Sequence, residues 1–225
     1  MPLAVRRKNS AKSTSWLFES RPDMTGVTER TADERFGAAF YERYYRRAGT
    51  QVVSRADMRR RAEFIAAFAR HVSCPVRSIL DVGCGLGLLR DALLERLPRA
   101  RYTGLEISDY LCGRYGWQHG SVVSHAPTRP YDLVVCYDVL QYLGTNDARR
   151  AVANLARLCR GVLHFSALTT EDWEQHCDRR RTDRNVNLHR ASWYRRQLAS
   201  NFVNAGSGMF VRSTADIQLW ELERA

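Results

Sequence analysis

One short stretch of the sequence places an acid ahead of three alternating glycines, and this spacing indicates a ligand site. In the run SILDVGCGLG, Asp81 is followed by Gly83, Gly85 and Gly87. Because glycine weakens both strands and helices, three glycines in five residues indicate that the backbone passes close to something else. An apolar segment precedes the run and a helical pattern follows it. Doubly wound folds bind nucleotide and nucleoside cofactors at such a turn.

A second acid narrows the class of ligand. Glu106 ends the next apolar segment, RYTGLEI, and a carboxylate there can accept hydrogen bonds from two ribose hydroxyls. The GxGxxG pattern of dinucleotide sites is not satisfied, because Leu88 or Arg90 stands where its last glycine would be. A P-loop is excluded as well, since no lysine follows the glycines. The residues therefore suit a nucleoside joined to an amino acid rather than a ligand held by its phosphates.

The elements that must position these residues follow a repeating pattern. Strand-length apolar segments alternate with helical ones, which predicts a mostly parallel sheet with helices on both faces. The expected strands are 76–83, 101–107, 121–125, 131–140 and 161–168. The expected helices between them are 88–97, 109–116 and 146–159, the last one capped by Asn146 and Asp147.

The two ends of the chain differ from this central pattern. Two helices, 31–48 and 55–72, are expected before the sheet, and Arg59–Arg61 is expected on the solvated face of the second. After the fifth strand, residues 169–190 are polar and read as a loop. A helix over 191–202 and two antiparallel strands within 208–224, joined at 213–216, complete the expected fold.

The motifs resemble, in order, those of the class I methyltransferases that use S-adenosylmethionine, over about residues 76–225. This resemblance implies an α/β, Rossmann-like sheet of seven strands, mostly parallel, with an antiparallel C-terminal hairpin. It implies S-adenosyl-L-methionine as the cofactor, with Asp81 at its methionine end. The glycine loop would run beside the cofactor, Glu106 would bind the ribose, and Ile107 would lie against the adenine.

Two further motifs carry the same resemblance. In YDLVVCYDVLQYL, Tyr137 and Asp138 would edge the methionine and the methyl-transfer site. Tyr142 stands where many relatives carry a histidine, and it is a candidate catalytic residue. Many relatives have Gly-Asp after the third strand, whereas this chain has Gly120-Ser121. Ser121 would then replace the acid as partner of the adenine amino group.

The methyl acceptor should be bound by segments outside the sheet. Tyr41, Tyr44 and Tyr45 share one helix face, where Tyr41 could favour the sulfonium and Tyr45 could act in catalysis, unless the face only packs on the sheet. The polar segment after the fifth strand contains His176, the preferred candidate base. Its arginines, Arg179–Arg181, would either bind an acidic acceptor or lie in solvent.

The composition limits the alternatives. The net charge of +11, nearly all from arginine, leaves nucleic acid as a possible but less favoured partner. Six scattered cysteines form no CxxC pair and no zinc-site spacing, which predicts no metal and a reducing, cytoplasmic location. No apolar run approaches the ~18 residues of a membrane span.

The expected organisation is one domain after a basic tail. Residues 1–30 form a flexible segment and residues 31–225 a single methyltransferase domain. Its parts are cap helices 31–72, cofactor core 76–168, acceptor insertion 169–194 and closing elements 195–225. The expected function is methyl transfer to an O or N atom of a small molecule. The proline-containing motif of DNA amino-methyltransferases is missing after Asp138. RNA or protein methylation and a non-catalytic cofactor-binding role remain alternatives.

Overall fold

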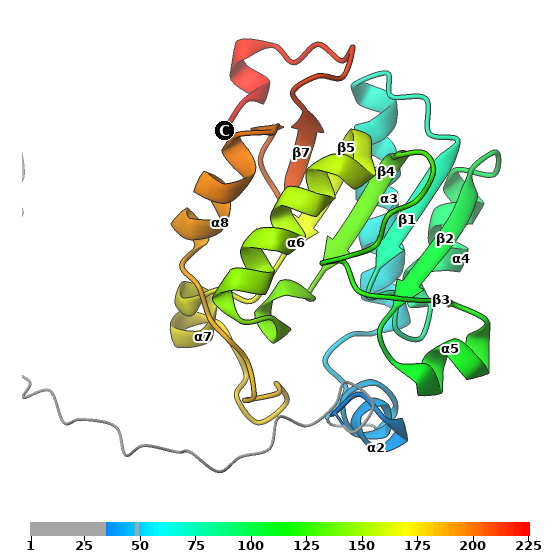
Figure 1. Cartoon of the computed structure of the whole chain (residues 1–225), viewed down its shortest axis with the longest axis vertical. Helices are drawn as coiled ribbons and strands as arrows, with labels where there is room; N and C mark the ends of the chain where they lie inside the picture. Colours follow the sequence, from blue (N-terminus) through cyan, green and yellow to red (C-terminus); the bar gives the residue numbers. More distant parts are fainter. Residues whose placement is uncertain (1–34, 48–49) are drawn as a thin grey trace, which may run out of the picture.

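The computed structural model describes residues 35–47 and 50–225, so the expected flexible segment 1–30 lies outside the described residues. Within the described part, seven strands form one sheet in the order β3-β2-β1-β4-β5-β7-β6 (Figure 1). The strands are β1 Ser78–Val82, β2 Arg101–Glu106, β3 Gln118–His119, β4 Tyr131–Tyr137, β5 Cys159–Ser166, β6 Phe202–Asn204 and β7 Met209–Arg212. Neighbours from β3 to β5 pair in parallel, and β7 pairs antiparallel with β5 and β6. The predicted fold class is confirmed.

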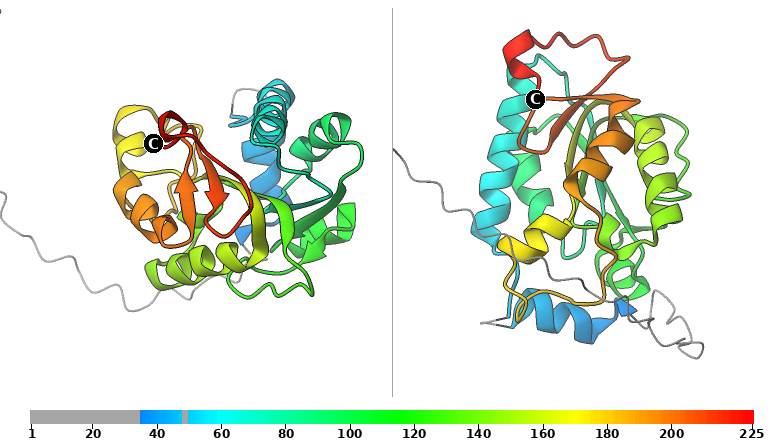
Figure 2. Two further views of the ribbon diagram at one scale, coloured as in Figure 1. Left: turned by 90° about the horizontal axis from the view of Figure 1, so that it is seen from above. Right: turned by 90° about the vertical axis from the view of Figure 1, so that its left-hand side faces the viewer.

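Helices cover both faces of the sheet, as the views in Figure 2 show. The helices α3 (Arg55–His71) and α4 (Leu88–Arg96) cover one face, and α6 (Thr145–Leu158) and α8 (Ala191–Ala199) cover the other. The strand β4 shows why its sequence is apolar throughout. Leu133 and Val135 belong to the core under α3 and α4, whereas Val134 and Cys136 belong to the core under α6 and α8. The short helix α5 (Asp109–Tyr115) lies at the β2–β3 edge.

The N-terminal cap is less regular than the sequence predicts. The helix expected over 31–48 is, within residues 35–47, a short α-helix α2 (Ala38–Tyr41) continued by a π-helical turn η1 (Glu42–Arg46). The amide of Arg47 donates to the carbonyl of Glu42, five residues back, over 2.9 Å. Such wide turns often accompany functional sites. This cap crosses below the carboxyl ends of the central strands in Figure 1.

The strand expected over 121–125 is wrong. The third strand is β3, and residues 121–125 form a turn in which the amides of Ser124 and His125 both donate to the carbonyl of Ser121. The two valines that suggested a strand pack in this turn instead, with Val122 in the core under α6. The Asn154 side chain holds the turn by donating to the carbonyls of Val122 and His125, over 2.8 and 2.9 Å.

The segment after β5 is more ordered than expected. A helix, α7 (Thr170–Gln175), occupies part of the predicted loop. Thr169 and Asp172 form a capping box at its start, in which each side chain bonds the other's backbone amide. The predicted cap of α6 is also wrong, because Gly144 is its N-cap. Asn146 and Asp147 lie inside the first turn.

The closing hairpin lies earlier in the chain than expected. The helix α8 ends at Ala199, and the hairpin turn falls between β6 and β7 rather than at 213–216. Gly206 and Gly208 allow this turn, since both have positive φ, 80° and 76°. Beyond β7, the described residues form a 3-10 turn, η3 (Glu221–Glu223), and no further strand. In the described part of the chain, no helix is both long and apolar enough to span a membrane.

Candidate active site

The register of the sheet brings the predicted cofactor residues to one edge. Val82, the last residue of β1, pairs with Leu105 of β2 and with Cys136 of β4. Glu106 follows Leu105, and Tyr137 follows Cys136. Both residues therefore flank the point where the chain leaves β1 for the glycine loop.

Two adjoining cavities open at this edge, below the strands and against the N-terminal cap. The Asp81 cavity, of about 390 Å³, is also lined by Tyr137, Gln141 and His176. The Glu106 cavity, of about 310 Å³, is also lined by Ile107 and Ser121. The two cavities share six residues, which are Phe40, Tyr45, Gly83, Gly85, Asp138 and Tyr142.

The Glu106 carboxylate is buried and organises the backbone around it. It accepts hydrogen bonds from the amides of Gly85 (2.9 Å), Ile107 (2.9 Å) and Ser108 (3.1 Å). A carboxylate has about four acceptor positions, so these bonds occupy most of them. Glu106 therefore holds the glycine loop against β2, a role that the sequence did not reveal.

The three glycines of the loop all have positive φ but serve different purposes. A Cβ on Gly83 would lie 2.5 Å from Val139, and one on Gly87 would lie 2.7 Å from the Trp117 indole. A Cβ on Gly85 would meet only the carbonyl of Gly83, at 3.9 Å. Gly85 is thus the glycine whose open side faces the cavities. Gly87 lines neither of the two cavities and is required for packing.

Asp81 lies in the Asp81 cavity, buried at the end of β1. The Tyr102 hydroxyl donates to its Oδ2 over 2.5 Å. Burial raises the pKa of Asp81 to about 7, and the Glu106 charge adds to the rise, whereas the bond from Tyr102 opposes it. Asp81 can therefore change its charge near neutral pH.

Asp138 lies between the two cavities in a left-handed backbone conformation, with φ of 56°. Burial raises the pKa of Asp138, while a hydrogen bond from Tyr137 and the charge of Arg61 lower it, and the nearby Asp172 raises it. A strained, non-glycine conformation at the edge of a cavity is typical of functional positions.

Arg61 supports Tyr137 from the helix α3. Its guanidinium carbon lies 3.8 Å from the centroid of the Tyr137 ring, and its Nη1 lies 2.9 Å from Nε2 of His164. Burial, followed by the Arg61 charge, lowers the pKa of His164 to about 3, so His164 is neutral and accepts this bond. The expectation that Arg59–Arg61 is a solvated face therefore fails at Arg61, which turns inward.

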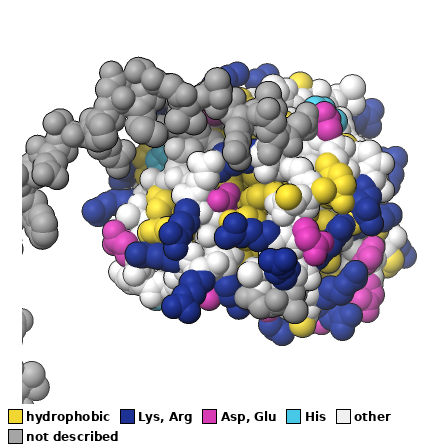
Figure 3. All heavy atoms as spheres, turned by 90° about the horizontal axis from the view of Figure 1, so that it is seen from below, with side chains coloured by type: hydrophobic (Ala, Val, Ile, Leu, Met, Phe, Trp, Pro, Cys, Tyr) yellow, Lys and Arg dark blue, Asp and Glu magenta, His cyan; other side chains and the backbone are white. Residues whose placement is uncertain are grey.

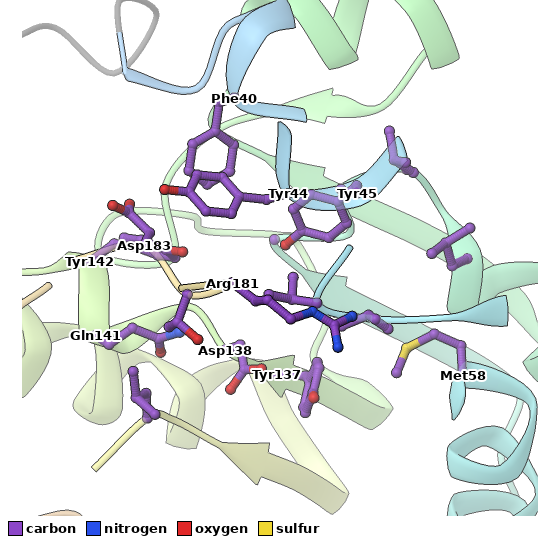
Figure 4. A pocket seen from close by; sticks show the side chains of 18 of the residues that line it. Phe40, Tyr44, Tyr45, Met58, Tyr137, Asp138, Gln141, Tyr142, Arg181 and Asp183 are labelled. Atoms are coloured by element: carbon purple, nitrogen blue, oxygen red, sulfur yellow. The ribbon is translucent and has the colours of Figure 1, made fainter. Parts of the chain in front are cut away.

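The predicted acceptor-side residues gather around the Asp81 cavity. Tyr45, Tyr142 and His176 all line it, and His176 is exposed at the C-terminal end of α7. Tyr41 instead lines the Glu106 cavity and is buried. Figure 4 shows the Arg181 side chain extending between the tyrosines of the cap and the pair Tyr137 and Asp138.

The arginine triplet is divided between two places. The Arg181 guanidinium donates to the carbonyl of Gln51 and lines the Asp81 cavity. Arg179 and Arg180 line a separate hollow with Arg43 and Arg184. In Figure 3, viewed from below, arginine side chains are spread over this face around hydrophobic and acidic ones.

Several residues of the site were missed by sequence reasoning. Tyr102 lies in the segment RYTGLEI and Gln141 in YDLVVCYDVLQYL, both of which the sequence analysis identified. The sequence of an apolar segment does not show, however, toward which neighbour a single polar side chain points. Arg61 belongs to a helix whose polar face reads as solvated. Asp172 is the third residue after Thr169, and this capping-box spacing could have revealed α7 and so its position.

Comparisons with known proteins agree with this geometry. Residues 80–161 match the model of a methyltransferase domain. The chain is 29% identical over 112 residues to a ubiquinone biosynthesis O-methyltransferase of Azoarcus sp. (strain BH72), covering 44% of this chain and 47% of that protein. The chain spans less than half the length of the curated relatives that it matches.

Solved structures share the fold. Magnesium protoporphyrin IX methyltransferase from Synechocystis PCC 6803, with bound SAH, matches with a TM-score of 0.59 and 19% identity, covering 80% of this chain and 98% of that one. CalS10 of Micromonospora echinaspora, an amino pentose methyltransferase with bound SAM, matches with a TM-score of 0.55 and 17% identity, covering 73% and 94%. The chain therefore shares the fold of these S-adenosylmethionine-dependent methyltransferases, and its residues 80–161 match a methyltransferase domain.

Proposed function

We propose that this protein transfers a methyl group from S-adenosylmethionine to an O or N atom of a small-molecule acceptor. The observation that carries the proposal is the pair of adjoining cavities. One is edged by Glu106 and the other by Asp81, and both are open to Gly85 and Asp138. This arrangement suits a ligand with a nucleoside at one end, an amino acid at the other, and the reacting group between them.

The residues present fit such a cofactor. Gly85 offers an open cradle beside both cavities, since a Cβ there would meet only the backbone of the loop. Glu106 would accept from the ribose with its remaining capacity, and Ile107 and Ser121 would contact the adenine. Asp81, when ionised, would hold the amino group of the methionine end. Tyr41 would close the Glu106 cavity from the cap.

When bound, the cofactor supplies an electrophilic methyl group on a positively charged sulfur. The protein's part is to hold the acceptor in line and to exclude water, and such positioning contributes ~7–11 kcal/mol. Burial raises the pKa of both Tyr45 and Tyr142 far above neutrality, so their phenols remain uncharged. We assign them to positioning the reacting groups rather than to proton abstraction.

Proton removal, where the acceptor requires it, falls to His176 or to Asp138. Both line the Asp81 cavity. His176 is exposed and can release a proton to water, whereas Asp138 lies deeper and nearer the strands. An imidazole side chain suits general base catalysis at neutral pH.

The names of the similar proteins support a small-molecule acceptor. They refer to ubiquinone biosynthesis, magnesium protoporphyrin IX and an amino pentose. Only the first of these names states an acceptor atom, oxygen, so together they do not select the atom for this chain. Four of the six cysteines are buried, which accords with a reducing cytoplasmic location, and we include that location in the proposal.

The proposal is tested by calorimetry with the purified full chain. We expect S-adenosylmethionine and S-adenosylhomocysteine to bind at one site per chain, and NAD not to bind. Gly85→Val should abolish this binding because the new side chain would enter the cradle. Gly113→Ala is the matched control, since a Cβ at Gly113 meets nothing within 4 Å. NAD binding without S-adenosylhomocysteine binding would contradict the proposal.

A second candidate is methylation of RNA, favoured by one observation. The hollow lined by Arg43, Arg179, Arg180 and Arg184, of about 470 Å³, shares Tyr44, Thr182 and Asp183 with the Asp81 cavity. Phosphates could lie in it beside a base that enters the cavity. An RNA acceptor predicts an affinity that falls steeply with salt and that weakens in Arg179→Ser. A salt-independent acceptor affinity favours the small molecule.

A further inference from the structure

The Asp81 cavity is acidic although the protein is strongly basic. Among the described residues that line it are five aspartates and a single arginine, Arg181, in a chain of net charge +11. The aspartates are Asp81, Asp138, Asp172, Asp178 and Asp183. The cavity therefore differs in sign from the surrounding surface, which favours a positively charged occupant.

The cofactor accounts for only part of this charge. Asp81 and Asp138 follow the strands and belong to the proposed cofactor site. The other three aspartates come from the segment after β5, and none of them lines the Glu106 cavity. Asp183 is paired with Arg35 at 3.8 Å, and Asp178 accepts from the Arg180 amide at 3.0 Å. Asp172 uses its Oδ2 to accept from Thr169.

Asp138 and Asp172 are two carboxylates of like charge in the same cavity. Both line the Asp81 cavity, and the charge of Asp172 raises the pKa of Asp138. Arg61 is the cation that lowers the pKa of Asp138, and it is engaged with the Tyr137 ring and with His164. A cation placed between the two carboxylates would relieve their repulsion.

An unpaired polar group in the same cavity points to a hydrogen-bond donor. Gln141 lines the Asp81 cavity and is only 4% exposed, and its buried Oε1 has no hydrogen-bond partner among the residues that the structure describes. Leaving a buried acceptor without a donor is unfavourable, because the oxygen has lost its water and gained no other partner. The terminal amide torsion of glutamine is soft, so an N–H donor within the cavity can reach this oxygen.

The remaining wall is aromatic. Phe40, Tyr44, Tyr45, Tyr137 and Tyr142 line the same cavity, and Figure 4 shows their rings above and below its centre. Aromatic faces attract cations, and the attraction is strongest where water is excluded. Carboxylates, an amide oxygen and aromatic rings together match an ammonium group that also carries apolar substituents.

We propose, resting on the methyltransferase function proposed above, that the acceptor is an amine bound as its ammonium ion beside Asp138, Gln141 and Asp172. The ammonium ion must lose one proton before it can react, to Asp138, His176 or water. The nitrogen lone pair then forms the N–C bond while the C–S bond breaks, and the electron pair of that bond stays on sulfur. The products are a methylated ammonium ion, S-adenosylhomocysteine and one released proton.

The test uses the full chain saturated with S-adenosylhomocysteine and three probes with the same ring. Cyclohexylamine is a cation, cyclohexanol is neutral and cyclohexanecarboxylate is an anion at pH 7.5. Titration followed by calorimetry or ligand-observed NMR should show the amine binding at least tenfold more tightly than the other two. Asp172→Asn should weaken amine binding at least fivefold, because asparagine keeps an oxygen for Thr169 but loses the charge. Gln141→Leu should also weaken it.

Glu174→Gln is the matched control, since Glu174 is exposed on the same helix and does not line the cavity. It should leave amine binding unchanged. With S-adenosylhomocysteine bound, equal affinity for amine and alcohol, preference for the carboxylate, or no binding of any probe would each overturn the inference while leaving the proposed function intact. Failure of the protein to bind S-adenosylhomocysteine at all would overturn the proposed function, and the inference with it.

Discussion

The Tyr102 hydroxyl on β2 donates a 2.5 Å hydrogen bond to Oδ2 of Asp81 on β1. Asp81 pairs in register with Gly104, so Tyr102 is its diagonal neighbour, two residues earlier on the adjacent strand and on the same face. The bond favours the ionised carboxylate, whereas burial favours the protonated one. The strand register thus sets the charge of the residue that we assign to the cofactor's amino group.

Tyr102→Phe should make cofactor binding require a higher pH. Loss of the donor raises the pKa of Asp81 further, so less of the carboxylate is ionised at neutral pH. We expect the affinity for S-adenosylhomocysteine at pH 7 to fall by about fivefold, because a rise of about one unit from a pKa of about 7 lowers the ionised fraction from about one half to about one tenth. Calorimetry from pH 6 to pH 9 should show the midpoint moving upward. Tyr131→Phe is the control, because Tyr131 is the first residue of β4 and the site lies beyond the last. Identical pH profiles of cofactor affinity for the two variants would contradict the role of Tyr102 in ionising Asp81.

Asp81→Asn should stabilise the protein without cofactor in alkaline solution. The pKa of Asp81 is about 7 in the folded protein, against an ordinary value of 3.8 for an aspartate in water. Between these values the folded state holds a proton that the unfolded state has lost, so this group lowers the free energy of unfolding as pH rises from about 4 to about 7. Asparagine removes the penalty while keeping an acceptor for Tyr102.

The difference between Asp81→Asn and wild type should be absent near pH 4 and largest above pH 7. Its ceiling is about 4 kcal/mol, from about three units of pKa at 1.36 kcal/mol each. Chemical denaturation at pH 4 and pH 8 measures it. A variant that is equally destabilised at both pH values would show that Asp81 is ionised throughout.

The sequence predicted the parts of this fold that depend on local pattern. Strands β1, β4 and β5 are largely apolar because both faces are covered, and α3 has its apolar stripe. The third strand was misplaced because Val122 and Val123 have strand propensity, while a side chain from α6 holds them in a turn. The roles of Arg61 and Gln141 depend on packing between elements far apart in the sequence. No local pattern reports such contacts.

Gly87→Ala and Gly85→Ala should separate packing from binding. At Gly87 the added Cβ would lie 2.7 Å from the Trp117 ring, and φ is 71°. We expect a loss of more than about 2 kcal/mol in the free energy of unfolding, from the left-handed backbone and the contact together. At Gly85 the space is open, so the loss should be about 1–2 kcal/mol, from the backbone alone. In Gly85→Ala, cofactor affinity should fall by more than the loss in the free energy of unfolding accounts for, because the open side of Gly85 faces the cavities. Equal stability losses at the two positions would contradict the distinction.

Glu106→Gln should weaken cofactor binding more than Ser121→Ala. The glutamine amide would turn a donor toward the Gly85 amide or toward the ribose, and the charge is lost in either case. Charge-assisted bonds contribute ~1.5–3 kcal/mol each, so we expect at least a tenfold loss of affinity. Ser121 accepts from the Val123 amide at 3.2 Å, and in the proposed site it would offer the adenine one neutral contact. Calorimetry on both variants makes the comparison, and a greater loss at Ser121 would reverse the two assignments.

Tyr45→Phe and His176→Ala should reduce turnover while cofactor affinity is kept. The measurement needs the acceptor, which screening of extracts with methyl-labelled cofactor would identify. Tyr45 lies where the two cavities meet, so loss of its hydroxyl should lower kcat by disturbing the alignment of the reacting groups.

If His176 removes the proton, its variant should lose about 10²–10⁴-fold in kcat, and the acidic limb of the pH profile should disappear. His71→Ala is the control, because His71 is exposed and pairs with Glu223 at 2.7 Å. Full activity of His176→Ala would assign proton removal to Asp138, and full activity of Tyr45→Phe would limit Tyr45 to lining the cavities.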